Sequence, residues 1–185
     1  MHPNPVQINN EFMTQDEINE WLDAIDRSGW VYNGATSESS IRIWRSELFH
    51  EKDMIEKLLA KLPKEWEFEV LQCFANGQTF GQNGEFHKDA EGDEYYTMLV
   101  YLSDITEHNY DFVRANTELA YDGEWGEKVQ QIEPFKGRCL IFKSNIIHRG
   151  CAPTWHTDIL RISLALKLRL KNLNTIKEGD ENSGD

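Results

Sequence analysis

The sequence contains no long apolar run and no recognisable leader. None of the apolar runs in its 185 residues approaches the length of a membrane span. The opening stretch, MHPNPVQINNEF, does not follow the pattern of a signal peptide. We therefore expect a cytoplasmic protein that has no membrane partner.

Cysteine is also scarce. Three cysteines, an odd number without a Cys-x-x-Cys pair, do not indicate a disulfide framework. Cys73 and Cys139 lie inside the apolar, strand-like runs VLQCFA and GRCLIF, so we expect both to be buried thiols. Cys151 follows His148 by three residues and could ligate a metal, but no neighbouring cysteine supports that role.

Positive charge is in short supply, because 19 Lys and Arg stand against 32 Asp and Glu and give a net charge of −13. A protein that binds a nucleic-acid backbone usually concentrates positive charge, so nucleic acid is the less favoured partner. A local basic patch is still compatible with the negative net charge. The composition, 39% hydrophobic and 28% charged, is typical of a globular domain. We expect one domain over residues 1–170 and a flexible acidic tail at 171–185.

The first third of the chain has the pattern of two helices. In TQDEINEWLDAIDRSGW, Thr14 and Glu17 have the spacing of a capping box, and Gly29 is a plausible stop. The apolar positions of this segment fall on one helical face at Ile18, Trp21, Leu22 and Ile25. EKDMIEKLLAKL predicts a second helix that ends before Pro63. We expect a helical buttress over about residues 12–63.

From Trp66 the pattern changes to short apolar or alternating runs separated by turn residues, which indicates strands. These runs are EFEVLQCFA, YYTMLVYLS, FVRANTELAY, KVQQIEP, GRCLIF and ILRISLALKLRL. The chain shows no internal repeat. We expect a mainly β protein with flanking N-terminal helices, whose β core over about residues 66–170 forms a sandwich or barrel.

One stretch, NGEFHKDAEGDEYY, suggests a metal site. On an extended chain His87 and Asp89 project to the same side, but a lone His-x-Asp is common by chance. His148 lies 59 residues after Asp89, just past an apolar strand, and an adjacent strand could bring it to the pair. Two imidazoles and a carboxylate form the facial triad of non-haem iron(II) enzymes, although zinc accepts the same ligands. Apart from His2 at the terminus, the remaining histidines lie in polar segments, and we expect them to be exposed: His50, His108 and His156.

Arg161 is the second unusual residue, because it lies on an otherwise apolar strand in ILRISLALKL. A charged side chain there is costly without a partner. The partner is either a carboxylate of the protein or, functionally, the carboxylate of a small acid held beside the metal. Ser163 shares the face of Arg161 and could add a hydroxyl group.

Four motifs in order resemble the iron(II)- and 2-oxoglutarate-dependent dioxygenases, in particular their prolyl 4-hydroxylase-like branch. FMTQDEINEWLDAIDRSGW is similar to the leading helix of that branch, and FHKDAEGDEYYTMLVYLS to its His-x-Asp and following strand. IEPFKGRCLIFKSNIIHRGCAP resembles the stretch that runs to the distal histidine, and RISLALK the last core strand. The resemblance covers most of the chain and implies a double-stranded β-helix, or jelly-roll.

The resemblance also implies roles for residues. His87, Asp89 and His148 correspond to the iron ligands and catalytic centre, and Arg161 to the anchor of the 2-oxoglutarate carboxylate. Tyr101 corresponds to a tyrosine that hydrogen-bonds the same carboxylate, or else it is a core aromatic residue.

The cosubstrates implied are 2-oxoglutarate and O2, with ascorbate as a candidate reductant. The activity that the resemblance implies is hydroxylation of a C–H bond of a prolyl or other peptidyl substrate, with release of succinate and CO2. Because both histidines must be neutral to ligate the metal, we expect metal affinity to fall in mild acid.

The sequence departs from the family pattern at four places. Phe74 stands where relatives have a tyrosine, and Lys167 where they often have an aromatic residue. YDFVRANTELAY replaces a usual Gly-Gly, and the spacing from His148 to Arg161 is slightly long. These departures leave the metal site intact and the substrate open.

Two alternatives remain for the function. An oxygenase acting on nucleic acid or a free small molecule would use the basic residues of RISLALKLRL, and a non-catalytic domain would keep only the fold. The segments 34–46 and 120–128 are either rims of a pocket or solvated connections. The sequence leaves the substrate and the oligomeric state undecided.

Overall fold

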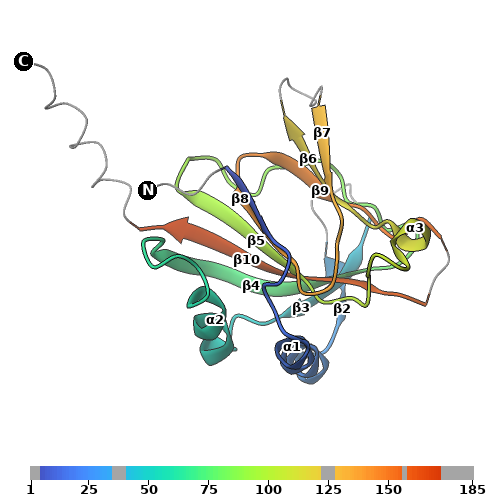
Figure 1. Cartoon of the computed structure of the whole chain (residues 1–185), viewed down its shortest axis with the longest axis horizontal. Helices are drawn as coiled ribbons and strands as arrows, with labels where there is room; N and C mark the ends of the chain where they lie inside the picture. The colour runs from blue at the N-terminus through green and yellow to red at the C-terminus, as the bar shows by residue number, and fades with distance from the viewer. Residues whose placement is uncertain (1–4, 35–40, 122–127, 156–157, 172–185) are drawn as a thin grey trace, which may run out of the picture.

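The computed structural model of the chain describes residues 5–34, 41–121, 128–155 and 158–171. Two antiparallel sheets form the molecule (Figure 1). The seven-stranded sheet has the order β1-β8-β5-β10-β4-β3-β2 and the three-stranded sheet the order β7-β6-β9. The large sheet comprises β1 (Val6–Asn9), β2 (Val31–Gly34), β3 (Ile43–Glu47), β4 (Phe68–Gln78), β5 (Tyr95–Tyr101), β8 (Cys139–Lys143) and β10 (Arg161–Leu170). The small sheet comprises β6 (Thr117–Tyr121), β7 (Lys128–Ile132) and β9 (Ile147–Gly150).

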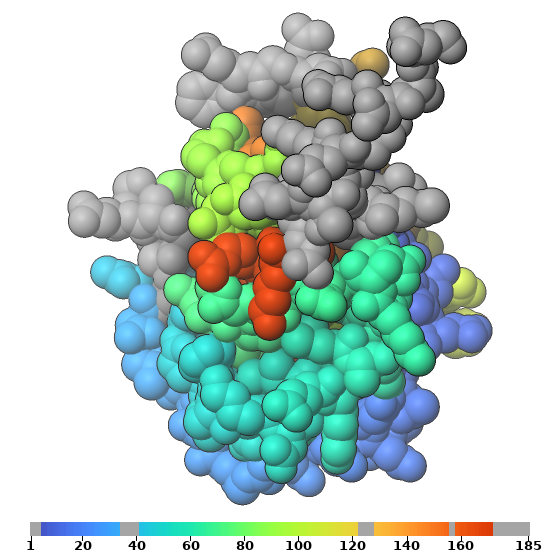
Figure 2. All heavy atoms as spheres, turned by 90° about the vertical axis from the view of Figure 1, so that its left-hand side faces the viewer, coloured from blue at the N-terminus to red at the C-terminus, as the bar shows by residue number. Residues whose placement is uncertain are grey.

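Two helices, α1 (Gln15–Ser28) and α2 (Lys52–Leu59), lie on one side of the large sheet, opposite the small sheet (Figure 1). α1 begins where the sequence predicts. The Thr14 hydroxyl accepts from the Glu17 N–H, and the Glu17 carboxylate accepts from the Thr14 N–H. The helix α1 ends at its C-cap residue Gly29, whose φ of 76° suits a residue without Cβ. In the space-filling view of Figure 2, α2 covers much of one end of the molecule, and the end of β10 surfaces above it.

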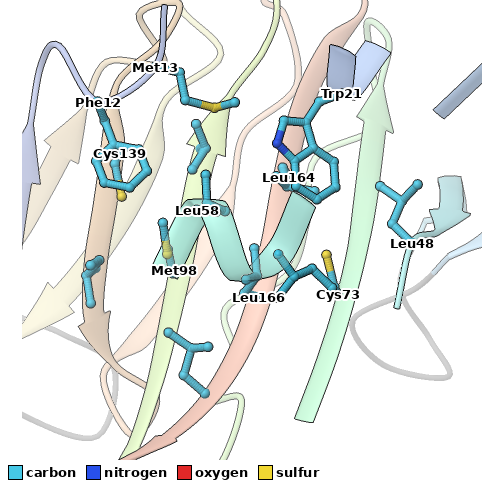
Figure 3. Close-up of a cluster of buried hydrophobic side chains, with 14 of the residues drawn as sticks. Phe12, Met13, Trp21, Leu48, Leu58, Cys73, Met98, Cys139, Leu164 and Leu166 are labelled. Atoms are coloured by element: carbon cyan, nitrogen blue, oxygen red, sulfur yellow. The ribbon is translucent and has the colours of Figure 1, made fainter. Parts of the chain in front are cut away.

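The faces of the large sheet have different partners, because successive side chains of a strand point to opposite sides. Toward the helices, Leu164, Leu166, Met98 and Cys73 pack with Trp21 of α1 and Leu58 of α2 (Figure 3). The intervening residues of the same strands face the small sheet. There the buried side chains of both sheets form a second cluster: Phe74, Leu99, Tyr101, Leu119, Ile132, Leu140, Phe142 and Ala165.

The structure confirms the mainly β jelly-roll and corrects several local expectations. The segment 12–63, expected to be helical, also contributes β2 and β3 to the large sheet. Its short runs lack a clear alternation, and pairing with the long strand β4 makes them strands. The run 112–121, expected to be one strand, begins inside a short helix, α3 (Tyr110–Val113), and becomes strand only at Thr117.

Some expectations fall on residues that the structure does not describe. Residues 35–40 and 122–127, within the two segments expected to be either rims of a pocket or solvated connections, lie outside the described residues. The predicted tail lies outside them as well, apart from Lys171. In the described part of the chain, none of the helices has the length and apolar character needed to cross a bilayer.

The cysteines behave as small apolar residues. Cys73 and Cys139 are buried and carry free thiols, as the sequence predicts, and Cys151 is a free thiol at an intermediate position. Burial raises the pKa of Cys73 to about 12 and raises the pKa of Cys139 as well. These two thiols are therefore protonated and unreactive at neutral pH.

Candidate active site

The backbone brings the two histidines together. The His87 N–H donates to the His148 carbonyl at 3.0 Å, and the His148 N–H donates to the His87 carbonyl at 2.9 Å. Two residues on, the Asp89 N–H donates to the Ser144 carbonyl at 2.9 Å. These hydrogen bonds hold the segment around His87 alongside the segment that leads into β9. Residues far apart in the sequence therefore lie side by side.

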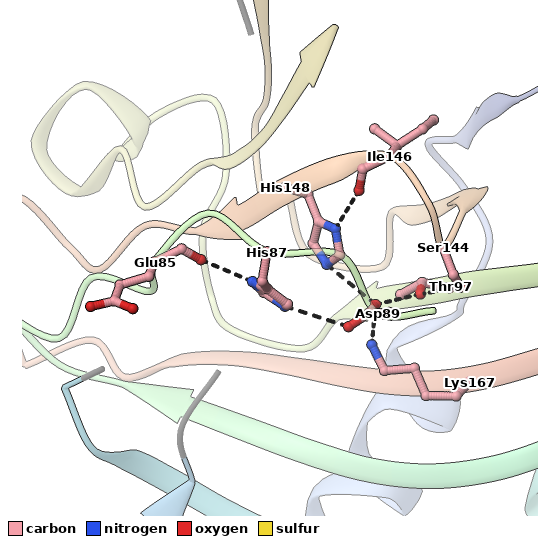
Figure 4. Close-up of polar contacts among 8 residues, drawn as sticks. All are labelled: Glu85, His87, Asp89, Thr97, Ser144, Ile146, His148 and Lys167. Atoms are coloured by element: carbon pink, nitrogen blue, oxygen red, sulfur yellow. Dashed lines mark hydrogen bonds and ion pairs between the residues drawn. The ribbon is translucent and has the colours of Figure 1, made fainter. Parts of the chain in front are cut away.

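The three side chains converge on one point (Figure 4). His87 Nε2 lies 3.4 Å from Asp89 Oδ1, and His148 Nε2 lies 3.2 Å from Asp89 Oδ2. One potential ligand atom from each residue lies within 4.8 Å of the others. Within the described residues this is the only group of three or more His, Cys, Asp or Glu side chains arranged to hold a metal.

Hydrogen bonds set the tautomers of both imidazoles. His87 Nδ1 lies 2.9 Å from the Glu85 carbonyl oxygen, and His148 Nδ1 lies 2.9 Å from the Ile146 carbonyl oxygen (Figure 4). A carbonyl oxygen only accepts, so each Nδ1 carries a proton. In the neutral ring the Nε2 lone pair then points toward Asp89. Two lone pairs facing a carboxylate repel one another unless a cation lies between them, so the donor set fits a divalent metal.

His148 is neutral at pH 7. Its side chain is 6% exposed, and burial lowers the pKa of His148 below its ordinary value, although the Asp89 carboxylate acts in the opposite direction. A neutral imidazole is the form that ligates a metal. Burial therefore keeps His148 in its ligating form.

Asp89 is held by residues from two neighbouring strands of the large sheet. Its side chain is 8% exposed. Thr97 of β5 donates to Oδ2 at 2.5 Å, and the Lys167 ammonium, which reaches up from β10, forms an ion pair with the same oxygen (Figure 4). Burial opposes ionisation, but hydrogen bonds from the histidine rings in their protonated form and the charge of Lys167 hold the pKa of Asp89 below its ordinary value. Lys167, which the sequence marks only as a departure from the family pattern, is part of the site.

Arg161 lies at the other end of the cavity and is 2% exposed. Its Nε donates to the Ala115 carbonyl at 2.8 Å, and its terminal nitrogens donate to Gln78 at 2.8 Å, Ser163 at 3.2 Å and Thr117 at 2.9 Å. All four acceptors are uncharged. Among the described residues no carboxylate forms an ion pair with Arg161, so the internal salt bridge considered from the sequence is absent there.

Tyr101 reaches this arginine indirectly. It is fully buried, its hydroxyl donates to Thr117 Oγ1 at 2.7 Å, and its ring centroid lies 5.5 Å from Arg161 Cζ. Gln78 and Thr117 complete the group, and sequence reasoning missed both. Gln78 could have been found, because it shares the face of Phe74 on β4, whereas Thr117 has no local signal.

A cavity of about 400 Å³ connects the two ends of the site. Alternate residues of three strands line it: Gln72, Phe74, Asn76 and Gln78 of β4, Tyr95, Thr97 and Leu99 of β5, and Arg161, Ser163, Ala165 and Lys167 of β10. Arg45 of β3 adds a guanidinium that lies 3.6 Å above the centroid of the Phe74 ring. The volume lies at the lower end of the range of small-molecule sites.

The other candidate metal ligands do not join the triad. The His50 side chain is 62% exposed and lies beside Glu51, and His108 is exposed, as expected. His156 lies outside the described residues. Cys151 is absent from the group of candidate metal ligands.

No family model matches the chain, and no curated protein matches its sequence. Solved structures do match. A prolyl hydroxylase from Trichoplax adhaerens, in complex with a peptide fragment of the hypoxia inducible factor oxygen degradation domain, has 18% identity and a TM-score of 0.67, covering 90% of this chain and 84% of that one. A Pseudomonas putida prolyl-4-hydroxylase has 13% identity and a TM-score of 0.66, with coverages of 90% and 93%. HygX from Streptomyces hygroscopicus, with nickel, 2-oxoglutarate and hygromycin B bound, has 11% identity and a TM-score of 0.67, with coverages of 91% and 84%.

The fold is therefore that of the 2-oxoglutarate–iron(II) oxygenases. Prolyl hydroxylases are among the proteins that share it, as the sequence motifs imply. At identities of 11–18% this likeness shows the fold, and the chemistry has to be argued from the residues of the site.

Proposed function

We propose that this chain is an iron(II)- and 2-oxoglutarate-dependent oxygenase that hydroxylates a C–H bond and releases succinate and CO2. The observation that carries the proposal is the pair of imidazoles whose Nδ1 atoms are bonded to backbone carbonyls and whose Nε2 atoms converge on Asp89. That arrangement has the ligand types of the facial triad. We assign the oxygenase domain to residues 1–170.

His87, Asp89 and His148 would hold the metal, and Thr97 would orient the carboxylate. When bound, iron(II) supplies the activation of oxygen that couples decarboxylation of 2-oxoglutarate to oxidation of the substrate. Arg161 would bind the far carboxylate of 2-oxoglutarate. As a buried cation whose acceptors among the described residues are all uncharged, it is suited to a ligand anion.

Ser163, Gln78 and Thr117 hold the guanidinium of Arg161 in one orientation. Tyr101 supports Thr117 and so acts on 2-oxoglutarate through Arg161. The apolar walls supplied by Phe74, Leu99 and Ala165 would exclude water from the reacting atoms. The protein's contribution is thus to position the cosubstrate and the substrate C–H bond.

The substrate belongs to one of two chemical kinds. The Trichoplax structure contains a peptide and the HygX structure contains hygromycin B, so the fold accepts both peptides and small molecules. The net charge of −13 disfavours a long nucleic-acid strand. Ascorbate remains a prediction from the resemblance.

The test is a two-stage reaction. Anaerobic addition of Fe(II) and then 2-oxoglutarate should produce a metal-to-ligand absorption band, and exposure to oxygen should produce succinate. Asp89→Ala should abolish both. His108→Ala, which changes an exposed histidine away from the cavity, serves as the control and should leave both intact. Absence of the band and of succinate in the wild-type protein would refute the oxygenase.

A further inference from the structure

Two cations lie close to one aromatic ring in the cavity. Arg45 Cζ lies 3.6 Å and Lys167 Nζ 5.8 Å from the centroid of Phe74. The three residues come from the neighbouring strands β3, β10 and β4, and all of them line the cavity. None of the three belongs to the metal triad or to the group around Arg161.

The cavity carries more positive charge than the proposed cofactors neutralise. Among its described lining residues, Arg45, Lys88, Arg161 and Lys167 are positive and Asp89 alone is negative, a formal balance of four minus one, or +3. A divalent metal and the dianion of 2-oxoglutarate cancel each other and leave that balance unchanged. This excess is unusual in a chain whose net charge is −13. Cations in a cavity are stabilised by an anionic partner.

Arg45 and Lys167 are the cations that can take that partner. Arg161 would already take the far carboxylate of 2-oxoglutarate, and the Lys88 side chain, 41% exposed, lies near the surface. Arg45 pairs with Glu47, whose side chain is 66% exposed, and an exposed pair of this kind is weak. Lys167 would share Asp89 with the metal, which weakens its hold on that carboxylate.

The cross-strand neighbours of the two cations are polar: Gln72 and Thr97 beside Lys167, and Asn76 beside Arg45. Both cations also lie close to the apolar ring of Phe74, and Ile43, Leu71 and Leu99 add apolar lining to the cavity. A ligand that fits has an anionic group for the guanidinium and ammonium and an apolar part to lie against the ring. A guanidinium matches carboxylate and phosphate geometry with two parallel hydrogen bonds.

We propose that Arg45 and Lys167 bind a carboxylate or phosphate group of the substrate, whose apolar part packs against Phe74. The substrate of this oxygenase is thus a small anionic molecule with an apolar body. The inference rests on the proposed function, because it assigns the substrate of the same site.

The probes are 3-phenylpropionate, phenyl phosphate and, as a neutral match, 3-phenylpropionamide. They are titrated by ligand-observed NMR into protein saturated with Zn(II) and 2-oxoglutarate, a redox-inert complex that does not turn over. The better anion should bind at least about tenfold more tightly than the amide, as expected for charge-assisted hydrogen bonds. A preference between the two anions identifies the group that the site takes.

Arg45→Gln and Lys167→Gln should each weaken binding of that anion about tenfold and leave the amide unchanged. Arg169→Gln is the matched control, because it removes the same charge from an exposed position of β10 outside the cavity, and it should have no effect. Phe74→Leu should weaken binding of all three probes, because each contains a phenyl ring.

Equal affinity for amide and anions, no measurable binding of either anion, or undiminished binding in Arg45→Gln would overturn the inference. Binding of Zn(II) and 2-oxoglutarate is measured first in the same samples. Their failure to bind would count against the proposed function, whereas normal cofactor binding without anion preference would count against the substrate class alone.

Discussion

The Lys167 ammonium contacts the Asp89 carboxylate, which lies between the two histidines. A lysine thus shares the carboxylate that would ligate a metal. Electrostatically the two cations compete, since a divalent ion bound to Asp89 would lie close to the ammonium. Lys167 should therefore stabilise the metal-free protein but weaken its affinity for a metal.

We expect Lys167→Met to raise the affinity for Mn(II) at least about tenfold, because repulsion between the ammonium and the metal disappears. The metal-free variant should lose about 1–3 kcal/mol of unfolding free energy, because the buried Asp89 carboxylate loses a partner. Calorimetric titration and denaturant unfolding measure the two effects. Arg169→Met, a change at an exposed site on the same strand, is the control. Weaker metal binding in Lys167→Met would contradict the competition.

Metal binding should weaken in mild acid, because a proton and the metal compete for each Nε2. Burial lowers the pKa of His148 below the ordinary value of 6.5, so this ring is neutral at pH 7 and takes up protons only below that value. The dissociation constant for Mn(II) should therefore change little between pH 7.5 and 7 and rise as the pH falls below about 6.5. A constant value down to pH 5 would show that the histidines are not ligands.

The lowered pKa of His148 also predicts how the stability of the metal-free protein depends on pH. His148 binds a proton more readily in the unfolded chain than in the folded one, so its effect on stability is absent above pH 6.5 and destabilising as the pH falls toward the folded pKa. The pKa of Asp89 is also lowered on folding, so its stabilising contribution persists until the pH falls below its ordinary 3.8. Urea unfolding with a chelator should show a first decline below pH 6.5. His148→Gln should remove that decline.

Arg161→Lys keeps the charge but removes the planar fork, which a lysine cannot replace. We expect the dissociation constant for 2-oxoglutarate to rise about tenfold or more, with metal affinity within twofold of wild type. Anaerobic titration of the Fe(II)-loaded protein, followed by its absorption band, gives both values. Arg138→Lys, a change at a buried arginine that pairs with Glu133, should leave the 2-oxoglutarate affinity unchanged. Equal effects of the two variants would indicate a general loss of structure.

Tyr101→Phe removes the hydroxyl that donates to Thr117 and should cost about 0.5–1.5 kcal/mol of unfolding free energy. If Tyr101 acts through Thr117 and Arg161, the KM for 2-oxoglutarate should rise, but by less than in Arg161→Lys. Tyr110→Phe removes a comparable hydrogen bond, to Asn116, from a residue outside the cavity lining. An unchanged KM in Tyr101→Phe would leave Tyr101 a core aromatic residue.

Local signals in the sequence were sufficient for much of the fold. The capping box at Thr14 and Glu17 sets the start of α1, because it depends on groups three residues apart. Alternation on β4, β5 and β10 indicates strands, because apolar residues cover one face of the sheet. The sequence did not predict β2 and β3. They form strands because of pairing with a distant strand and not because of their own pattern.

For the candidate site too, some features were evident from the sequence and others depended on the tertiary structure. The sequence determined the ligand types, since His87, Asp89, His148 and Arg161 stand out by chemistry and spacing, and it marked Phe74 and Lys167 as departures. Only the tertiary structure decided that Lys167 contacts Asp89, that Arg45 lies over Phe74 and that Arg161 has uncharged partners. The reason is geometric. These contacts join side chains from β3, β4, β10 and β6, and no pattern within one strand specifies which strand will lie beside it.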